Sequence, residues 1–414
     1  MIGAVINAHA KSRDTNGAVK YMELAKILNI KASVPTLTAM INVFAEKGDK
    51  KGAIKWFNEI IYNKGLRSDI DIASINSIIK AHVKNRDKKG AWKYFKLVDS
   101  YDLTPDLITM NEMIHVCGQV GDHNLAEKFF DIMLKIGITP DLFTMNSMIS
   151  AHAYMRDING AVKYFNMTVN DFKLVPDIIT MNAIINIHAQ AGNVDGALSY
   201  YNLFSKFNIQ PDLFTMNAMI NAYAQAGNIN GAVEQYDQIQ TIYGMKPDIV
   251  TLNAIILAHA IVKDKDGALS YFNDLILNFH LKPNARTLNI LLQSHIRSGA
   301  TIEYKDVKKI LELFPYYDVP MDSHTYMQLL LACKYNKNHI IRARLARRTF
   351  DDLLKNNIIP HYYLIDVFRD TIGTEAFNEY VQQNKSHFEN SEKYTINRRP
   401  INRRWKKIIH KVPL

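Results

Sequence analysis

The sequence is poor in cysteine and has no long apolar run. Its 414 residues include two cysteines, Cys117 and Cys333, too few for a disulfide framework or for a zinc site built on cysteine pairs. We expect both to fill helix interiors as small apolar side chains. Apolar stretches are broken by Asn, His or Lys well short of the roughly 20 residues that a membrane helix needs. The sequence therefore predicts neither a disulfide-stabilised fold nor a membrane-spanning one.

Signals of targeting and of several enzyme classes are also missing. The sequence does not start with a cationic segment before an apolar one, or with an Arg-rich and Ser-rich presequence. Its first residues match the interior of a repeat described below, so we expect the first helix to lack its start. The zinc motif of deaminases is absent, and the acidic residues between Asp351 and Glu375 lie in a stretch without strand pattern to hold a metal nuclease. We predict no catalysis, no cofactor and no metal site.

The positive charge of the chain is concentrated at its end. Between Lys393 and Leu414 there are eight Lys or Arg and no acid, and the whole chain has a formal charge of +10. Subtracting those eight charges leaves about +2 for residues 1–392. We expect residues 384–414 to form a basic tail, either solvated or in contact with phosphate without regard to sequence. The rest is nearly neutral, so local groups must hold any anionic ligand.

What the sequence does contain is a repeat of about 35 residues. Residues 142–177 return, lightly changed, on both sides of that stretch. A period in the thirties without strand-like alternation is typical of helix pairs that bury their apolar faces against their neighbours. We therefore expect an all-α solenoid of about ten helix-turn-helix repeats. One equivalent position is occupied by Thr38, Asn76, Asn111, Asn146, Asn182, Asn217, Asn253, Asn289 and Met327.

Each repeat carries its own signals for helix start, close contact and stop. In residues 142–177 the first helix is expected over about 144–156, and Asp157 then caps the second. Gly160 and Ala161 are small enough to let two helices approach closely. Pro176 and Asp177 close the unit, because proline cannot continue a helix. The cap recurs at Asp14, Asp49, Asp87, Asp122, Asn193, Asn228 and Asp264.

A helix pair of this length, ending in Pro-Asp, with Asn five residues into the next unit and Gly-Ala opening the second helix, resembles the pentatricopeptide repeat family. It is similar to the plain class, whose repeats are near-uniform. The resemblance covers residues 1–361, with a truncated first repeat; we expect capping helices over 362–383. Tetratricopeptide repeats have a similar period, but their Trp-Leu-Gly-Tyr pattern is absent here. The resemblance implies a right-handed superhelix that binds single-stranded RNA, one base per repeat.

The resemblance implies that base choice lies with the fifth residue of the first helix and the last residue of the unit. An amide offers a donor and an acceptor to a pyrimidine, and a neighbouring carboxylate orients it. In the family, Asn with Asp goes with uracil, Thr with Asp with guanine, and Asn with Asn with cytosine or uracil, which gives 5′-GUUUUU(C/U)U-3′. Asp69 is an alternative to Asp71. The pairs are Thr38 with Asp71, Asn76 with Asp106, Asn111 with Asp141, Asn146 with Asp177, Asn182 with Asp212, Asn217 with Asp248, Asn253 with Asn284, and Asn289 with Asp322.

A further position implied by the resemblance lies three residues before the base-reading residue, where a side chain stacks on the bases. Such stacking contributes about 1 to 3 kcal/mol per base, so several bases give firm binding to a nearly neutral body. Arg286 could add a phosphate or cation–π contact. The equivalent positions of the outer repeats hold Pro35, Ala73 and His324. The predicted stacking residues are Ile108, Phe143, Ile179, Phe214, Val250 and Arg286.

The repeated asparagines and histidines also have other interpretations. Asn at a helix start is often no more than a cap or turn residue, and duplicated repeats copy it without selection. Histidine recurs as well, but ligands one repeat apart cannot converge on an ion. We therefore expect the histidines to pack or form hydrogen bonds between helices; they are His9, His82, His152, His188, His259 and His295.

The sequence thus predicts a monomeric, sequence-selective RNA-binding protein acting in stabilisation, processing or translation of organellar transcripts. Family resemblance places it in the mitochondrial matrix, although no presequence is visible. Organellar ribosomes and RNA-processing proteins are candidate partners. The alternative is a structural repeat protein of an organellar ribosome or another protein assembly. A third hypothesis is a processing enzyme whose catalytic domain precedes this sequence.

Overall fold

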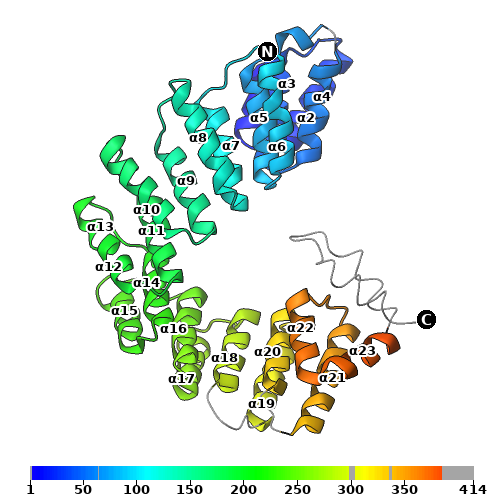
Figure 1. The fold of residues 1–414 in the computed structure, drawn as a ribbon. Coiled ribbons are helices and arrows are strands. Elements are labelled where there is room, and N and C mark those ends of the chain that lie inside the picture. Colours follow the sequence, from blue (N-terminus) through cyan, green and yellow to red (C-terminus); the bar gives the residue numbers. More distant parts are fainter. Residues whose placement is uncertain (1, 64, 298–303, 335–337, 385–414) are drawn as a thin grey trace. The chain divides into compact units, whose positions relative to one another are not determined.

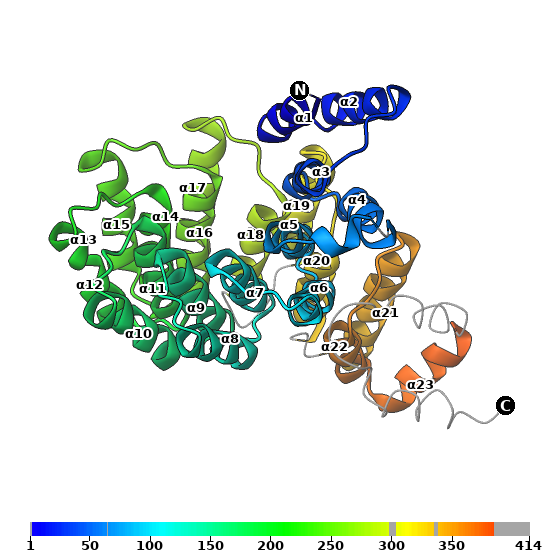
Figure 2. The same ribbon diagram turned by 90° about the horizontal axis from the view of Figure 1, so that it is seen from above.

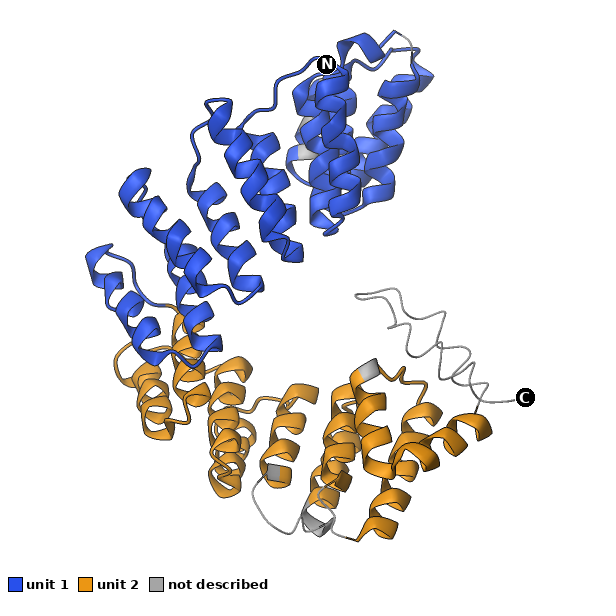
Figure 3. Cartoon of the chain, viewed as in Figure 1, with its two compact units in different colours: residues 1–211 blue, residues 212–414 orange. Residues whose placement is uncertain are grey.

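The described part of the chain is built from paired α-helices. The computed structural model describes residues 2–63, 65–297, 304–334 and 338–384, and every regular element within them is helical. The chain divides into two units, residues 1–211 and residues 212–414 (Figure 3). The predicted basic tail, from residue 385 onward, lies outside the described residues.

Unit 1 is a succession of helix pairs, interrupted by two short irregular turns. The 3₁₀ turn η1 (Arg67–Asp69) precedes the fifth helix, and the π-helical turn η2 (Met167–Asp171) extends the tenth. The α-helices of unit 1 are α1 (Ile2–Lys11), α2 (Thr15–Ile27), α3 (Val34–Glu46), α4 (Lys50–Tyr62), α5 (Ile72–Lys84), α6 (Lys88–Ser100), α7 (Leu107–Val120), α8 (His123–Lys135), α9 (Leu142–Tyr154), α10 (Ile158–Asn166), α11 (Ile178–Gln190), α12 (Val194–Tyr201) and α13 (Leu203–Lys206).

Unit 2 continues the same pattern with five helix pairs among its described residues. Phe350 and Phe368 stack between its last two pairs, with ring centroids 4.2 Å apart. The last pair occupies residues 362–383, where the sequence predicts capping helices. The α-helices of unit 2 are α14 (Leu213–Gln225), α15 (Ile229–Thr241), α16 (Ile249–Ile261), α17 (Lys265–Leu277), α18 (Ala285–Arg297), α19 (Tyr304–Tyr316), α20 (Ser323–Lys334), α21 (His339–Lys355), α22 (Tyr362–Ile372) and α23 (Thr374–Gln383).

The first helices of successive repeats pack on one another and form one layer of each unit. In unit 1, α3 contacts α1 and α5, and α7 contacts α5 and α9; in unit 2, α16 contacts α14 and α18. Second helices pack on their own first helix and, in most repeats, on that of the next repeat, as α4 does on α3 and α5. Figure 1 and Figure 2 show this pairing from two directions. Equivalent residues of the first helices therefore recur side by side along each unit.

The core between the two layers is made by apolar side chains at helical spacing. Met145 and Met148 of α9 are fully buried, and Phe130 of α8 meets Tyr164 of α10 edge to face at 5.4 Å. Burying a side chain of this size stabilises the fold by about 1.5 to 3 kcal/mol. The prediction for the cysteines is confirmed for Cys117, which is fully buried within α7 and whose pKa burial raises to about 12.

The first helix of the repeat begins two residues earlier than the sequence pattern suggests. We expected residues 144–156, whereas α9 runs Leu142–Tyr154. The reason is that Asp141, assigned to the end of the preceding unit, caps α9: its carboxylate accepts a hydrogen bond from the backbone N–H of Thr144 at 2.8 Å. The same residue thus closes one repeat and starts the next, which places Thr144 in the first helical turn.

The predicted caps of the second helices are confirmed. In α6 the Asp87 carboxylate accepts a hydrogen bond from the backbone N–H of Gly90 at 3.0 Å. The equivalent cap is formed at Asp14, Asp49, Asp122, Asp157, Asn193, Asn228 and Asp264.

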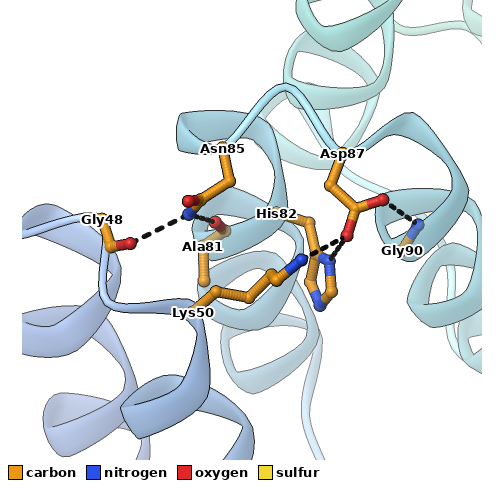
Figure 4. A network of polar contacts seen from close by, with 7 residues as sticks. All are labelled: Gly48, Lys50, Ala81, His82, Asn85, Asp87 and Gly90. Atoms are coloured by element: carbon orange, nitrogen blue, oxygen red, sulfur yellow. Dashed lines mark hydrogen bonds and ion pairs between the residues drawn. The ribbon is translucent and has the colours of Figure 1, made fainter. Parts of the chain in front are cut away.

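The Asp87 cap also takes part in contacts between helices. Figure 4 shows Asp87 meeting Nδ1 of His82 at 2.9 Å and Nζ of Lys50, from the preceding repeat, at 2.8 Å. Asn85 adds a bond to the backbone of that preceding repeat. Burial alone would raise the pKa of Asp87, but the hydrogen bonds from Lys50, Gly90 and His82 hold it far below its usual range. The recurrent histidine of this repeat thus bonds the cap, as predicted.

The described residues offer no sign of a membrane span or of a metal site. None of their helices is both long and apolar enough to cross a bilayer. In the same part of the chain, no three His, Cys, Asp or Glu side chains gather where they could hold a metal ion.

Candidate nucleic-acid interface

The residues predicted to choose the base begin with the Asp that caps each first helix. Asp106 caps α7, and it forms a capping box with Thr109: the carboxylate accepts from the Thr109 backbone N–H at 2.8 Å, and the Thr109 hydroxyl accepts from the Asp106 N–H at 3.2 Å. Asp71 holds the equivalent place before α5, whereas the alternative residue Asp69 lies in the turn η1. The capping box fixes the direction of the Asp side chain.

The Asn of the preceding repeat joins this capping box. Nδ2 of Asn76 donates to the Asp106 carboxylate at 3.0 Å, and the Thr109 hydroxyl donates to Oδ1 of Asn76 at 2.6 Å. Asn76, Asp106 and Thr109 therefore form a closed Asn–Asp–Thr triad that spans two repeats. Because the carboxylate can only accept and the hydroxyl faces the amide oxygen, the triad determines which way the amide points.

The triad recurs in the next two repeats of unit 1. Nδ2 of Asn111 donates to Asp141 at 3.1 Å and Nδ2 of Asn146 to Asp177 at 3.3 Å. Each amide oxygen accepts from a threonine hydroxyl, at 2.5 Å and 2.6 Å respectively. The threonines are Thr144 and Thr180.

Unit 2 holds a variant of the same arrangement. Nδ2 of Asn289 donates to Asp322 at 3.1 Å, but the oxygen of its amide is buried with no hydrogen-bond partner among the described residues. The oxygens of Asn217 and Asn253 are in the same state. The residue predicted to pair with Asn253 is Asn284, whose side-chain oxygen accepts from the backbone N–H and the hydroxyl of Thr287. The remaining predicted pair, Asn182 with Asp212, is divided between the two units.

Most of the amides predicted to read bases are covered by their neighbours. Asn76 and Asn111 are each 7% exposed, and Asn253 is 3% exposed. In Asn253 the amide oxygen is buried. The N–H group of that amide is therefore the polar group that can meet a ligand. Asp106 and Asp141 are more accessible than the amides beside them. The triads therefore present a small, fixed edge that offers a donor and a neighbouring carboxylate oxygen that accepts.

Two of these carboxylates are held in the charged state. Burial works to raise the pKa of Asp106, but hydrogen bonds from the backbone and hydroxyl of Thr109 and from Asn76 lower it below its usual value. The pKa of Asp322 is lowered in the same way by Thr325 and Asn289. An ionised carboxylate has no proton to give, so each of these groups acts as an acceptor.

The predicted stacking residues stand exposed next to the triads. Ile179 is 63% exposed and Phe143 is 47% exposed, although both are large and apolar; Phe143 leans on the His115 ring at a centroid distance of 5.1 Å. Exposed apolar side chains at a constant place in successive repeats offer surfaces on which a ligand can pack. Ile108, Phe214, Val250 and Arg286 are exposed as well.

Charge on this face is locally balanced. Lys80 and Lys84 follow Asn76 by one and two helical turns, so they share its face of α5. Glu46 of α3 lies 3.8 Å from Nζ of Lys84 and also pairs with Lys80. Burial would raise the pKa of Glu46, but the hydrogen bond from Lys80 outweighs it and lowers the pKa. These cations therefore already have a carboxylate partner.

The threonine of the triad was not among the site residues predicted from the sequence. Thr144 is fully buried and bonds both Asp141 and Asn111, yet we treated it as an ordinary helix residue. The signal was present, since a hydroxyl residue stands three positions after the closing Asp or Asn in every one of these repeats. Three of these residues, Thr109, Thr144 and Thr180, complete the triads described above. The residues at this position are Ser74, Thr109, Thr144, Thr180, Thr215, Thr251, Thr287 and Thr325.

Three models of known repeat families match this chain. The model described as PPR repeat family matches residues 105–154 and 176–225, and that described as pentatricopeptide repeat domain matches residues 61–119 and 237–295. A third, described as PPR repeat, matches residues 35–64, 143–170 and 214–242. Together these matches cover more than half of the chain. The comparison with curated proteins found no match.

Solved structures resemble the fold over nearly the whole chain. The pentatricopeptide repeat protein PPR10, in complex with an 18-nt psaJ RNA element, superposes with a TM-score of 0.69 at 16% identity, covering 95% of this chain and 61% of that one. PPR10 from maize gives a TM-score of 0.55 at 19% identity, covering 96% of this chain and 54% of that one. At identities this low the likeness establishes the α-solenoid fold alone, and this chain spans less than two thirds of the length of these relatives.

Proposed function

This chain belongs to the pentatricopeptide repeat family, and on the row of Asn–Asp–Thr triads we propose that it binds single-stranded RNA, one base per repeat, with a preference for uridine-rich tracts. The observation that carries the proposal is that the Asn and Asp of each complete triad meet across consecutive repeats. A repeated pair at a repeated spacing suits a ligand that is itself a chain of similar units, and single-stranded RNA with splayed bases is such a ligand.

The chemistry of the triad suits uracil. The Watson–Crick edge of uracil carries the keto oxygen O4, an acceptor, next to the ring N3–H, a donor. The Asn111 amide offers an N–H, and the Asp141 carboxylate offers an acceptor, so the two meet that edge with matching polarity. In cytosine the corresponding atoms are an amino group and an unprotonated ring nitrogen, and both polarities are reversed. The exposed Ile108 and Phe143 then stack on the base faces.

The site that follows from the pairs is 5′-GUUUUU(C/U)U-3′, with Thr38 choosing the first base and Asn253 with Asn284 the seventh. We further infer that the targets are organellar transcripts, that the protein acts as a monomer in the mitochondrial matrix, and that binding stabilises the transcript or directs its processing or translation. These finer assignments rest on family membership.

The proposal is tested by measuring the affinity of the full chain for 5′-GUUUUUUU-3′ against oligonucleotides of the same length made of adenine or cytosine. We expect the uridine-rich strand to bind at least tenfold more tightly, which corresponds to about 1.4 kcal/mol. Equal affinity for all three would contradict base reading. That result would favour the alternative function, a scaffold in an organellar ribosome or another assembly, because a scaffold has no use for base identity.

A further inference from the structure

The threonine of each complete triad has a role that its place as a helix cap does not require. Thr144 already satisfies the start of α9 through its own backbone N–H, which donates to Asp141 at 2.8 Å, and through its hydroxyl, which accepts from the Asp141 backbone N–H at 3.1 Å. Its hydroxyl still has one proton to donate. The acceptor is Oδ1 of Asn111, which lies 2.5 Å from the hydroxyl oxygen.

The Thr144 hydroxyl stabilises the structure more by donating to the Asn111 oxygen than by donating to the Asp141 carboxylate. The Asp141 oxygen nearest the hydroxyl already accepts from the Thr144 N–H and from Nδ2 of Asn111. The Asn111 amide is 7% exposed, so an oxygen left there without a donor would lose its water partners and gain none from the protein, which destabilises that arrangement. The hydroxyl of Thr144, which is itself fully buried, supplies that donor.

We propose that Thr109, Thr144 and Thr180 are positioning residues that hold the base-reading amides with the N–H outward and so set the preference for a keto oxygen over an amino group. This inference rests on the proposed function and adds a specificity determinant to it. An amide released from the hydroxyl can turn its oxygen outward, where it accepts from the amino group of cytosine. Loss of the threonine contact therefore weakens discrimination between uracil and cytosine.

The chain contains its own control for this proposal. Thr325 stands to Asp322 as Thr144 stands to Asp141, with the same capping bonds at 2.8 Å and 3.2 Å and the same full burial. Nδ2 of Asn289 donates to Asp322 as Nδ2 of Asn111 does to Asp141. The difference is that the Asn289 oxygen has no hydrogen-bond partner among the described residues. Replacing Thr325 thus removes the same cap without removing a contact to the amide.

The experiment measures the affinity of the full chain for 5′-GUUUUUUU-3′ and for two strands with cytosine at the third or the eighth base, the positions assigned to Asn111 and Asn289. In T144V we expect the preference for uracil at the third base to fall about tenfold, while the preference at the eighth base is unchanged. T325V leaves both preferences as in the wild type. T144S keeps the hydroxyl and restores the preference at the third base.

Two results would overturn the inference while leaving RNA binding intact. One is a T144V protein that keeps the wild-type preference at the third base. The other is a T325V protein that loses the preference at the eighth base to the same extent, since the effect would then come from the helix cap. A wild-type chain without any preference for uracil overturns the proposed function itself, and this inference with it.

Discussion

At the scale of single residues, the hydrogen-bond partner of each buried histidine separates otherwise similar repeats. His152 meets Asp157 at 2.7 Å and His259 meets Asp264 at 2.8 Å. In the first of the two repeats between them, His188 faces a cap formed by Asn193, and both ring nitrogens of His188 are buried without a hydrogen-bond partner among the described residues. Burial lowers the pKa of His188.

Replacing Asn193 by Asp should therefore stabilise the protein. A carboxylate keeps the cap and gains the histidine contact seen in the neighbouring repeats, for which we expect about 1 kcal/mol. In the wild type the unfolded chain takes up a proton at His188 more readily than the folded chain, so stability falls as the pH drops through about 6.5. A carboxylate at position 193 supports the charged ring, so the advantage of N193D grows below that pH.

The measurement is urea denaturation of wild type and N193D at pH 7.5 and pH 5.5. N228D is the matched control, because Asn228 forms the same cap while Tyr223 replaces the histidine of that repeat. An N193D gain that is matched by N228D, or that shrinks at the lower pH, would contradict the explanation.

Residue identities that recur with the repeat could be predicted from the sequence, whereas their contacts could not. The caps at Asp87 and Asp157 follow from local rules about helix starts, and the structure confirms both. The bond from Thr144 to Asn111 joins residues 33 positions apart, and no local rule connects them. The base-reading and stacking roles remain predictions, since nothing bound to the protein tests them.

At the scale of helices, the recurring glycine is explained by the aromatic ring that faces it. A Cβ added to Gly90 would lie 1.9 Å from Nδ1 of His82 and 2.7 Å from the Asp87 carboxylate. His82 is 4% exposed and therefore has little room to move aside. At Gly52 and Gly231 the ring belongs to Phe44 and Tyr223 instead. The sequence predicted a close approach of two helices here, but not which side chain fills the space.

Substituting Gly90 by Ala should destabilise unit 1 despite the better helix propensity of alanine. Relief of the glycine penalty is worth about 1 kcal/mol, but displacing a buried ring typically costs about 1 to 3 kcal/mol and here also disturbs the cap. We expect a lower urea midpoint for G90A than for the wild type.

The control for this substitution is G65A. A Cβ on Gly65 would meet nothing closer than Asn63 Oδ1 at 3.5 Å, so we expect a change within about 0.5 kcal/mol. A G90A protein as stable as G65A would show that the ring can retreat and that the glycine is not needed for the approach.

At the scale of the whole molecule, the residues proposed to select bases and the excess positive charge lie in different parts of the chain. The base-reading residues belong to residues 38–322, where the overall charge is small and cations such as Lys80 are already paired. Residues 393–414 carry eight Lys or Arg and no acid. A nearly neutral array should read bases through hydrogen bonds and stacking, while a basic tail should attract any phosphate chain.

Truncation after Glu392 should therefore weaken RNA binding without changing base preference. Each phosphate contact that is lost makes the slope of log affinity against log salt shallower by about 0.7 for single strands. Titrations of full-length and truncated protein at several salt concentrations give both quantities. An unchanged slope would mean that the tail contacts no phosphate, and a changed base preference would contradict the separation of roles.

The proposed base-reading roles are tested most directly by changing two of these residues and measuring which bases the protein then selects. The variant N111T/N146T keeps Asp141 and Asp177 in place and converts two consecutive Asn–Asp pairs to Thr–Asp. RNA selection on the purified wild-type and variant proteins should return uridine at the third and fourth positions for the wild type and guanine at both for the variant, with the other positions unchanged. Selection of the same sequence by both proteins would contradict the claim that these side chains read the RNA.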